Sequence, residues 1–103
     1  MSAPPFRLLY SDETKAVLED LRAKAQHARK LRKVKKALAF MEQQGPSYPG
    51  LRTHPMESIP GPNGKTLYQS YVENNTPGAW RIWWVYGPEA DQISIVSVGP
   101  HPD

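Results

Sequence analysis

Three residues in the sequence combine a reactive side chain with an unusual position. Arg81 interrupts the most apolar segment, WRIWWVY, where burial of an unpaired guanidinium would be very costly. We therefore expect Arg81 to meet an anion, and its planar fork suits two oxygens of a phosphate. His54 and His101 are candidates for proton transfer, because imidazole side chains titrate near neutral pH.

Further residues have side chains that could assist such a site. Glu73 and Glu57 are the candidate carboxylate bases. The alternative for Glu73 is a cross-strand ion pair with Arg81. The sequence leaves this alternative open, because it does not fix the strand register. Arg52 and Lys65 suit phosphate steering, and Tyr71 suits stacking on an unpaired RNA base. Catalysis is thus assigned to Arg81, His101, His54 and Glu73.

Positive charge is concentrated in one short run. Six of the 13 Lys and Arg residues fall between positions 29 and 36: Arg29, Lys30, Arg32, Lys33, Lys35 and Lys36. Residues 1–44 carry ten basic against five acidic residues, whereas residues 45–103 carry three against five. Such density indicates a polyanionic partner, most plausibly nucleic acid. The alternatives are a solvated helix face or a surface covered by a partner protein.

Length and composition limit the class of protein. With 103 residues, 39% of them hydrophobic, the chain suits a single globular domain over residues 1–103. It has no cysteine for disulfides or thiolate metal sites, and its three histidines lack metal-ligand spacing, so we expect no metal and no cofactor. The sequence contains no run of about 18 apolar residues, so we expect no membrane-spanning helix. The N-terminal segment lacks a signal-peptide pattern, so a cytoplasmic location is expected.

The pattern of the first half predicts a strand followed by two helices. Residues 6–10 read as a strand, and Ser11 or Asp12 can cap a helix that starts there. Apolar residues then follow helical spacing almost to Gly45-Pro46, which ends the helical region. A single helix of that length would run on the order of 50 Å, which is awkward for so small a domain. Two helices that break near residues 26–30 are therefore expected.

The second half predicts strands. Residues 45–65 are rich in Pro and Gly, so a long loop with one short extended piece around residues 51–56 is expected. Residues 65–73 read as a strand, and residues 80–86 and 93–98 as a hairpin in which Trp80, Ile82, Trp84 and Tyr86 face the helices and Trp83 shares the face of Arg81. The predicted class is α+β, an antiparallel sheet with a helical hairpin on one face, in the order β-α-α-β-β-β.

This order resembles the RelE/ParE superfamily of bacterial toxins, in particular its RelE- and HigB-like members. The segments that carry the resemblance are FRLLYSDETKAVLEDL, PGLRTHPM, WRIWWVYG and ISIVSVGPHPD. The resemblance implies the toxin of a type II toxin-antitoxin system, with a cognate antitoxin protein as partner. It also implies an endoribonuclease that acts on mRNA in the ribosome, through attack of the 2′-OH on the adjacent phosphate, without a metal. The active groove would lie on the sheet face opposite the helices.

The resemblance assigns residues unevenly. Arg81 matches an arginine thought to bind the scissile phosphate, His101 falls where the family places a basic residue or histidine, and His54 with Arg52 falls near other site positions. A lysine pair carried by some members appears here as Gln69 and Tyr71. The missing lysines favour two alternatives: a ParE-like gyrase poison that acts by binding alone, or a non-toxic relative that binds only its antitoxin or RNA.

Overall fold

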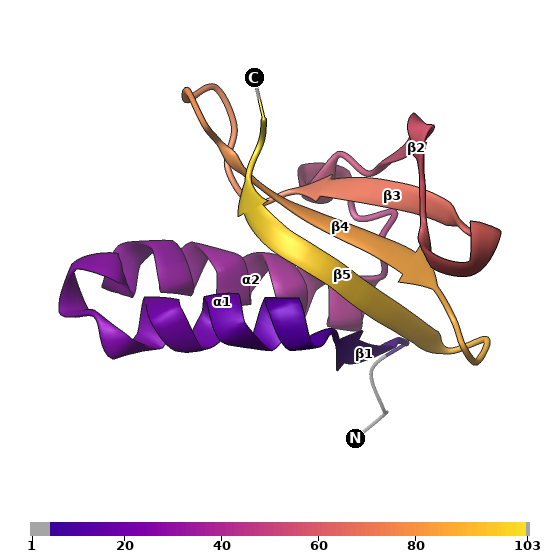
Figure 1. The fold of residues 1–103 in the computed structure, drawn as a ribbon, viewed down its shortest axis with the longest axis horizontal. Helices are drawn as coiled ribbons and strands as arrows, with labels where there is room; N and C mark the ends of the chain where they lie inside the picture. The colour runs from indigo at the N-terminus through magenta and orange to yellow at the C-terminus, as the bar shows by residue number, and fades with distance from the viewer. Residues whose placement is uncertain (1–4, 103) are drawn as a thin grey trace.

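A helical layer packs against one face of a five-stranded sheet in the computed structural model, which describes residues 5–102 (Figure 1). The strand order across the sheet is β1-β5-β4-β3-β2, and all neighbours are antiparallel except β1 and β5, which are parallel. The predicted α+β class with a helical hairpin on one face is confirmed. The parallel edge pair is an addition to the prediction.

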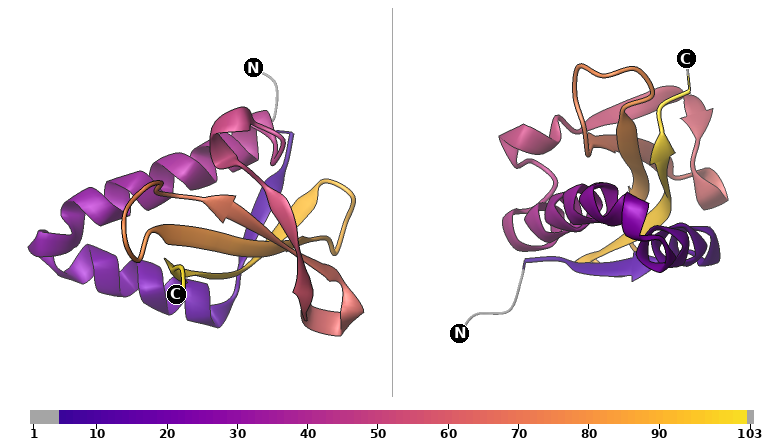
Figure 2. Two further views of the ribbon diagram at one scale, coloured as in Figure 1. Left: turned by 90° about the horizontal axis from the view of Figure 1, so that it is seen from above. Right: turned by 90° about the vertical axis from the view of Figure 1, so that its left-hand side faces the viewer.

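The helical layer consists of α1 (Asp12–Ala23) and α2 (Ala28–Gln44). Ser11 caps α1, because its hydroxyl oxygen accepts a hydrogen bond from the backbone N–H of Thr14 at 3.0 Å. Lys24 then adopts an extended conformation, and a short 3₁₀ turn over Ala25–His27 leads into α2. The two helices therefore run side by side in opposite directions (Figure 2), which confirms the predicted break. Neither is long and apolar enough to cross a lipid bilayer, nor is any other helix within residues 5–102.

The strands are β1 (Arg7–Tyr10), β2 (His54–Pro60), β3 (Thr66–Tyr71), β4 (Trp80–Tyr86) and β5 (Gln92–Pro100). The central strand β4 pairs with β3 on one side and with β5 on the other. A register shift lies beside Trp83 and Trp84, where β5 contributes one more residue than β4. Because the extra residue is on β5, the strict alternation of side chains along β4 survives.

Strand β2 corrects the expected loop. The sequence predicts only a short extended piece here, whereas His54–Pro60 forms an edge strand on β3, with a break in register between Pro55 and Pro60. Proline cannot donate a hydrogen bond to a neighbouring strand, but an edge strand needs partners on one side only. The proline-rich composition therefore conceals a strand, and the sheet has one strand more than predicted.

The core lies between the helices and the sheet. Val34 and Met41 of α2 meet Ile82 and Trp84 of β4, and all four side chains are fully buried. The prediction that Tyr86 belongs to this set is wrong, because Tyr86 is 44% exposed. Its ring contacts the edge of Trp84, but it lies at the last position of β4, at the margin of the core.

Candidate functional site

Arg81 lies on the sheet face opposite the helices. Its neighbours Ile82 and Trp84 belong to the core, so alternation along β4 directs Arg81 and Trp83 to the other side. In register, Arg81 is opposite Tyr71 on β3 and Gly99 on β5. Because Gly99 has no side chain, the neighbouring strand leaves space beside the guanidinium.

The guanidinium of Arg81 is held by an aromatic ring and by backbone carbonyls. Its central carbon lies 3.6 Å from the centroid of the Tyr71 ring, a close cation–π contact. Nη1 donates to the carbonyl of Glu73 and, at 3.1 Å, to the carbonyl of Trp80. Arg81 is only 8% exposed, its Nε is buried without a partner, and Nη2 makes no hydrogen bond within residues 5–102. The positive charge is thus positioned but not neutralised.

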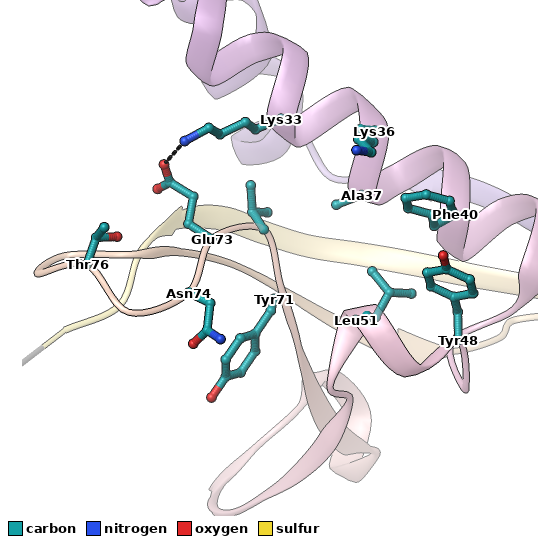
Figure 3. A pocket seen from close by; sticks show the side chains of 12 residues that line it. Lys33, Lys36, Ala37, Phe40, Tyr48, Leu51, Tyr71, Glu73, Asn74 and Thr76 are labelled. Carbon is teal, nitrogen blue, oxygen red and sulfur yellow. Dashed lines mark hydrogen bonds and ion pairs between the residues drawn. The ribbon is translucent and has the colours of Figure 1, made fainter.

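The Glu73 carboxylate is engaged with α2 and not with Arg81. It accepts hydrogen bonds from Lys30 at 2.5 Å, from Lys33 at 3.1 Å (Figure 3) and from the backbone N–H of Trp80 at 3.1 Å. Burial pushes the pKa of the Glu73 carboxyl upward, but these hydrogen bonds outweigh burial and lower the pKa from 4.5 to about 2. So weak a base is unsuited to accepting a proton near neutral pH. The Glu73 carboxylate thus links α2 to the segment that follows β3, and its catalytic role stays a prediction.

His54 belongs to a polar network on the same sheet face. It is the first residue of β2, opposite Gln69, and its Nδ1 lies 3.1 Å from the carbonyl of Arg52. Its Nε2 lies 3.4 Å from the side-chain nitrogen of Gln69, and the oxygen of that amide accepts from Nε1 of Trp83 at 3.1 Å. With these partners, Nδ1 carries the proton and Nε2 is the acceptor.

Tyr71 is the residue that joins these groups. Its ring contacts Arg81, lies edge-on to the His54 ring at 6.3 Å, and is 5.9 Å from the guanidinium carbon of Arg52. Arg52 and His54 are exposed, so the two arginines and the imidazole surround one aromatic ring at an accessible surface. We call Arg52, His54, Gln69, Tyr71 and Arg81 the arginine cluster. Such a cluster can hold a phosphate with two cations and move a proton with an imidazole.

Gln69 is the member of this cluster that sequence reasoning missed. The resemblance singles out this position only for its lack of a lysine, yet Gln69 is 3% exposed and bridges His54 and Trp83. The alternation of side chains along the strand could have identified it. Gln69 and Tyr71 are two positions apart, so both side chains fall on the face of the candidate site.

No hydrogen bond or ion pair joins the predicted site residues His101, Lys65 and Glu57 to this cluster within residues 5–102. The backbone N–H of His101 donates to the carbonyl of Ala79 at 2.8 Å, directly before β4, and its ring makes no hydrogen bond within residues 5–102. Lys65 is at the opposite end of β3 from Tyr71, where its Nζ donates to the carbonyl of Tyr86 at 2.9 Å. Glu57 is an exposed residue of β2.

The basic run occupies the first half of α2 and divides between two sides of the helix. Arg29, Arg32, Lys33 and Lys36 line one shallow depression, and we call them the basic face. Lys35 lies elsewhere, beside Leu8 and Glu42 in a pocket between α1 and α2. Lys30 points to Glu73. Within residues 5–102, Lys33 is the one member of the basic face with a carboxylate within 4.0 Å.

No set of three or more His, Asp or Glu side chains is arranged to hold a metal ion in the described part of the chain. The arginine cluster and the basic face both concentrate positive charge.

Comparison with known proteins gives a consistent picture of the fold. No family model matches the sequence, and no curated protein is detectably similar to it in sequence. The YoeB/ParE toxin of Agrobacterium tumefaciens superposes with a TM-score of 0.67 at 10% identity over 94% of this chain and all of that one. The YoeB dimer of Staphylococcus aureus gives 0.66 at 10% identity, covering 95% and 99% of the two chains. RelE of Pyrococcus horikoshii, solved as a RelE–RelB complex, gives 0.61 at 14% identity over 93% and 94%. The chain has the fold of the RelE/ParE toxin superfamily.

Proposed function

We propose that the protein is the toxin of a type II toxin-antitoxin system and cleaves mRNA on the ribosome. The observation that carries the proposal is the arginine cluster: an un-neutralised arginine on the open face of a RelE/ParE-like sheet, beside an exposed imidazole. A structural arginine would be expected to meet a carboxylate, and none of the described residues offers one within 4.0 Å. A phosphate of the substrate completes the site.

The reaction needs only groups that the chain and the RNA supply. His54 Nε2 leaves its weak 3.4 Å contact with Gln69 and takes the proton of the 2′-OH. The 2′-oxygen bonds to the adjacent phosphorus while the bond from phosphorus to the 5′-oxygen breaks. Arg81 and Arg52 stabilise the charge that develops on the phosphate. His101 is the candidate acid that returns a proton to the 5′-oxygen. The products are a 2′,3′-cyclic phosphate and a 5′-hydroxyl end.

The basic face of α2 supports binding to a large RNA. Arg29 lies in the first turn of α2, which contains no acidic residue. A positive side chain at this end of a helix opposes the helix dipole, so the stability of α2 does not account for Arg29. Counterion release from ribosomal RNA would favour their binding to the ribosome.

An antitoxin protein is the proposed second partner. The relative from Pyrococcus horikoshii was solved in a RelE–RelB complex, and this chain covers 94% of that RelE chain. This likeness of fold supports a protein partner for this chain. In this proposal the antitoxin neutralises the toxin by covering the arginine cluster.

One observation favours a toxin that acts by binding alone. Glu73 is engaged with two lysines, and the strand positions Gln69 and Tyr71 carry no lysine, so the cluster has few groups for proton transfer. A ParE-like gyrase poison would require no such groups. We keep it as the second candidate.

Single-turnover cleavage of an A-site codon on programmed ribosomes tests the proposal. The parent should cleave and leave the two ends given above, and His54→Ala should lower the rate and change its dependence on pH between about 5 and 8. Arg52→Ala tests the second cation of the cluster and should also lower the rate. Its matched charge control is Arg7→Ala, because Arg7 is an exposed cation at the far edge of the sheet. If the parent arrests growth without cleaving mRNA but blocks gyrase supercoiling, the nuclease proposal is wrong.

A further inference from the structure

A pocket of about 300 Å³ opens between α2 and the end of β3, directly beside the arginine cluster (Figure 3). Its floor is apolar, with Ala37 and Leu51 both nearly fully buried. Its size is at the lower end of the range of roughly 300–1,000 Å³ that is typical of small-ligand sites. The proposed reaction does not use this pocket.

One end of the pocket is aromatic. The rings of Phe40 and Tyr48 stack with centroids 4.4 Å apart and an interplanar angle of 12°, and both residues are only partly buried. Lys36 lies above this pair, with its Nζ 5.9 Å from the centroid of Phe40. A planar ligand can extend such a stack, and a lysine at its rim can bind an anionic group attached to that ligand.

The other end of the pocket is polar and repels an anion only weakly. Asn74 and Thr76 offer an amide and a hydroxyl, groups that can bind the edge of a base. The carboxylate of Glu73 also lies here, but Lys30 and Lys33 already neutralise it. An anionic ligand therefore meets little repulsion from this carboxylate.

The pocket connects the arginine cluster with the basic face. Tyr71 lines it, and the ring of this residue contacts Arg81 in the arginine cluster. Lys33 and Lys36 line it as well, and both belong to the basic face of α2. A chain of phosphates that runs from Arg81 to Arg32 would pass over this opening.

We propose that the pocket holds one nucleotide of a single-stranded RNA, next to the nucleotide whose phosphate meets Arg81. The base stacks on the Phe40–Tyr48 pair, and the flanking phosphates bind Lys36 and Arg32. The proposal rests on the proposed function in taking RNA as the substrate. Stacked rings beside an amide suit a planar base better than they suit an acidic peptide, which would need cations but no aromatic pair.

Binding without ribosomes tests this site separately from cleavage. The probe is a short single-stranded RNA that contains 2-aminopurine. Its fluorescence anisotropy measures affinity, and the quenching of the 2-aminopurine fluorescence measures stacking. Phe40→Leu keeps an apolar side chain but removes the ring, so affinity should fall about 5-fold or more and quenching should be lost. Tyr48→Leu should act in the same way, and thermal melts of both variants establish that they remain folded.

The charge component has its own matched pair. Lys36→Gln should weaken binding and lower the slope of log affinity against log salt by about 0.7, the value for one phosphate contact of a single strand. Lys35→Gln removes the same charge from the other side of α2, so its effect should be clearly smaller. Equal effects of the two variants would show that only the overall charge matters and would overturn the site.

Two other results would overturn the proposal. If Phe40→Leu and Tyr48→Leu are folded and bind with unchanged affinity and quenching, no base enters the pocket. If an oligo-aspartate peptide of equal charge competes as well as RNA, and Phe40→Leu weakens both, the pocket is a peptide site. The binding assay contains no ribosome, so its result is independent of the cleavage assay. A parent that binds RNA in this way but does not cleave mRNA on programmed ribosomes would refute the nuclease proposal and leave the pocket proposal intact.

Discussion

The two faces of strand β4 differ in how completely their polar groups are satisfied. On the helix side, Ile82 and Trp84 are fully buried, and the indole N–H of Trp84 donates to the hydroxyl of Ser70 at 2.8 Å. On the other side, Trp83 donates to Gln69, but Arg81 keeps a buried Nε without a partner and a charge without a counterion. The first face is complete without any ligand. The second is incomplete, and in the function proposed above a phosphate completes it.

The largest expected effect concerns the complete face. Trp84→Ala removes a fully buried indole and leaves Ser70 without its donor, so the free energy of unfolding should fall by about 3–5 kcal/mol. Trp83→Ala, on the open face of the same strand, should have a clearly smaller effect, because Trp83 is only partly buried. Urea unfolding of both variants measures the difference. Equal losses would mean that the two faces contribute alike to stability.

Much of this contrast was predictable from the sequence. The alternation along residues 80–86 placed Arg81 and Trp83 on one face and Ile82 and Trp84 on the other, and this holds. Two helices follow from apolar spacing and from the size of the domain. These features depend on local periodicity, which a sequence displays directly.

Features that depend on partners distant in the chain were not predictable. The carboxylate of Glu73 meets Lys30 and Lys33, about 40 positions earlier, and only its backbone carbonyl meets Arg81. Strand β2 was concealed because its prolines are tolerated only at a sheet edge, a position that the sequence does not reveal. Candidate residues could therefore be named from the sequence, whereas their grouping required the register of β3 on β4.

Arg81 tests the incomplete face. Arg81→Ala should lower single-turnover cleavage by about 10²-fold or more, the loss expected for one preorganised charge contact in a transition state. Ribosome binding should survive, because the basic face of α2 supplies most of the electrostatic attraction.

Arg81→Lys is the matched control. It keeps the positive charge but loses the close cation–π contact with Tyr71 and the Nη1 group that donates to two carbonyls. A lysine variant that cleaves like the parent would show that charge alone is sufficient. An alanine variant that cleaves like the parent would remove Arg81 from the reaction.

The basic face can be separated from the site by its dependence on salt. Changing Arg29, Arg32 and Lys36 to Gln should lower the slope of log ribosome affinity against log salt by roughly 0.7–0.9 for each phosphate contact that is lost. Changing Lys15 and Arg22 of α1, together with Lys24 directly after it, removes as much charge from the region of the other helix and is the control. The same change of slope in both triple variants would contradict a specific role for α2.

The smallest expected effect concerns the link between the two regions, the Glu73 carboxylate. Its pKa is about 2 in the folded protein, against 4.5 as the ordinary value, so the folded state binds its proton more weakly than the unfolded state does. The stabilisation is therefore fully present above about pH 4.5 and is lost as the pH falls toward 2.

Glu73→Gln keeps the backbone carbonyl that accepts from Arg81 but removes the charge that Lys30 and Lys33 meet. Because Lys33 is partly exposed and solvent screens the pair, the loss at pH 7 should be on the order of 1 kcal/mol. The difference between parent and variant should then shrink as urea unfolding is repeated at lower pH. Glu57→Gln, at an exposed position on β2, should show no such convergence. A Glu73→Gln deficit that persists unchanged at pH 2 would mean that packing, and not charge, joins α2 to the sheet.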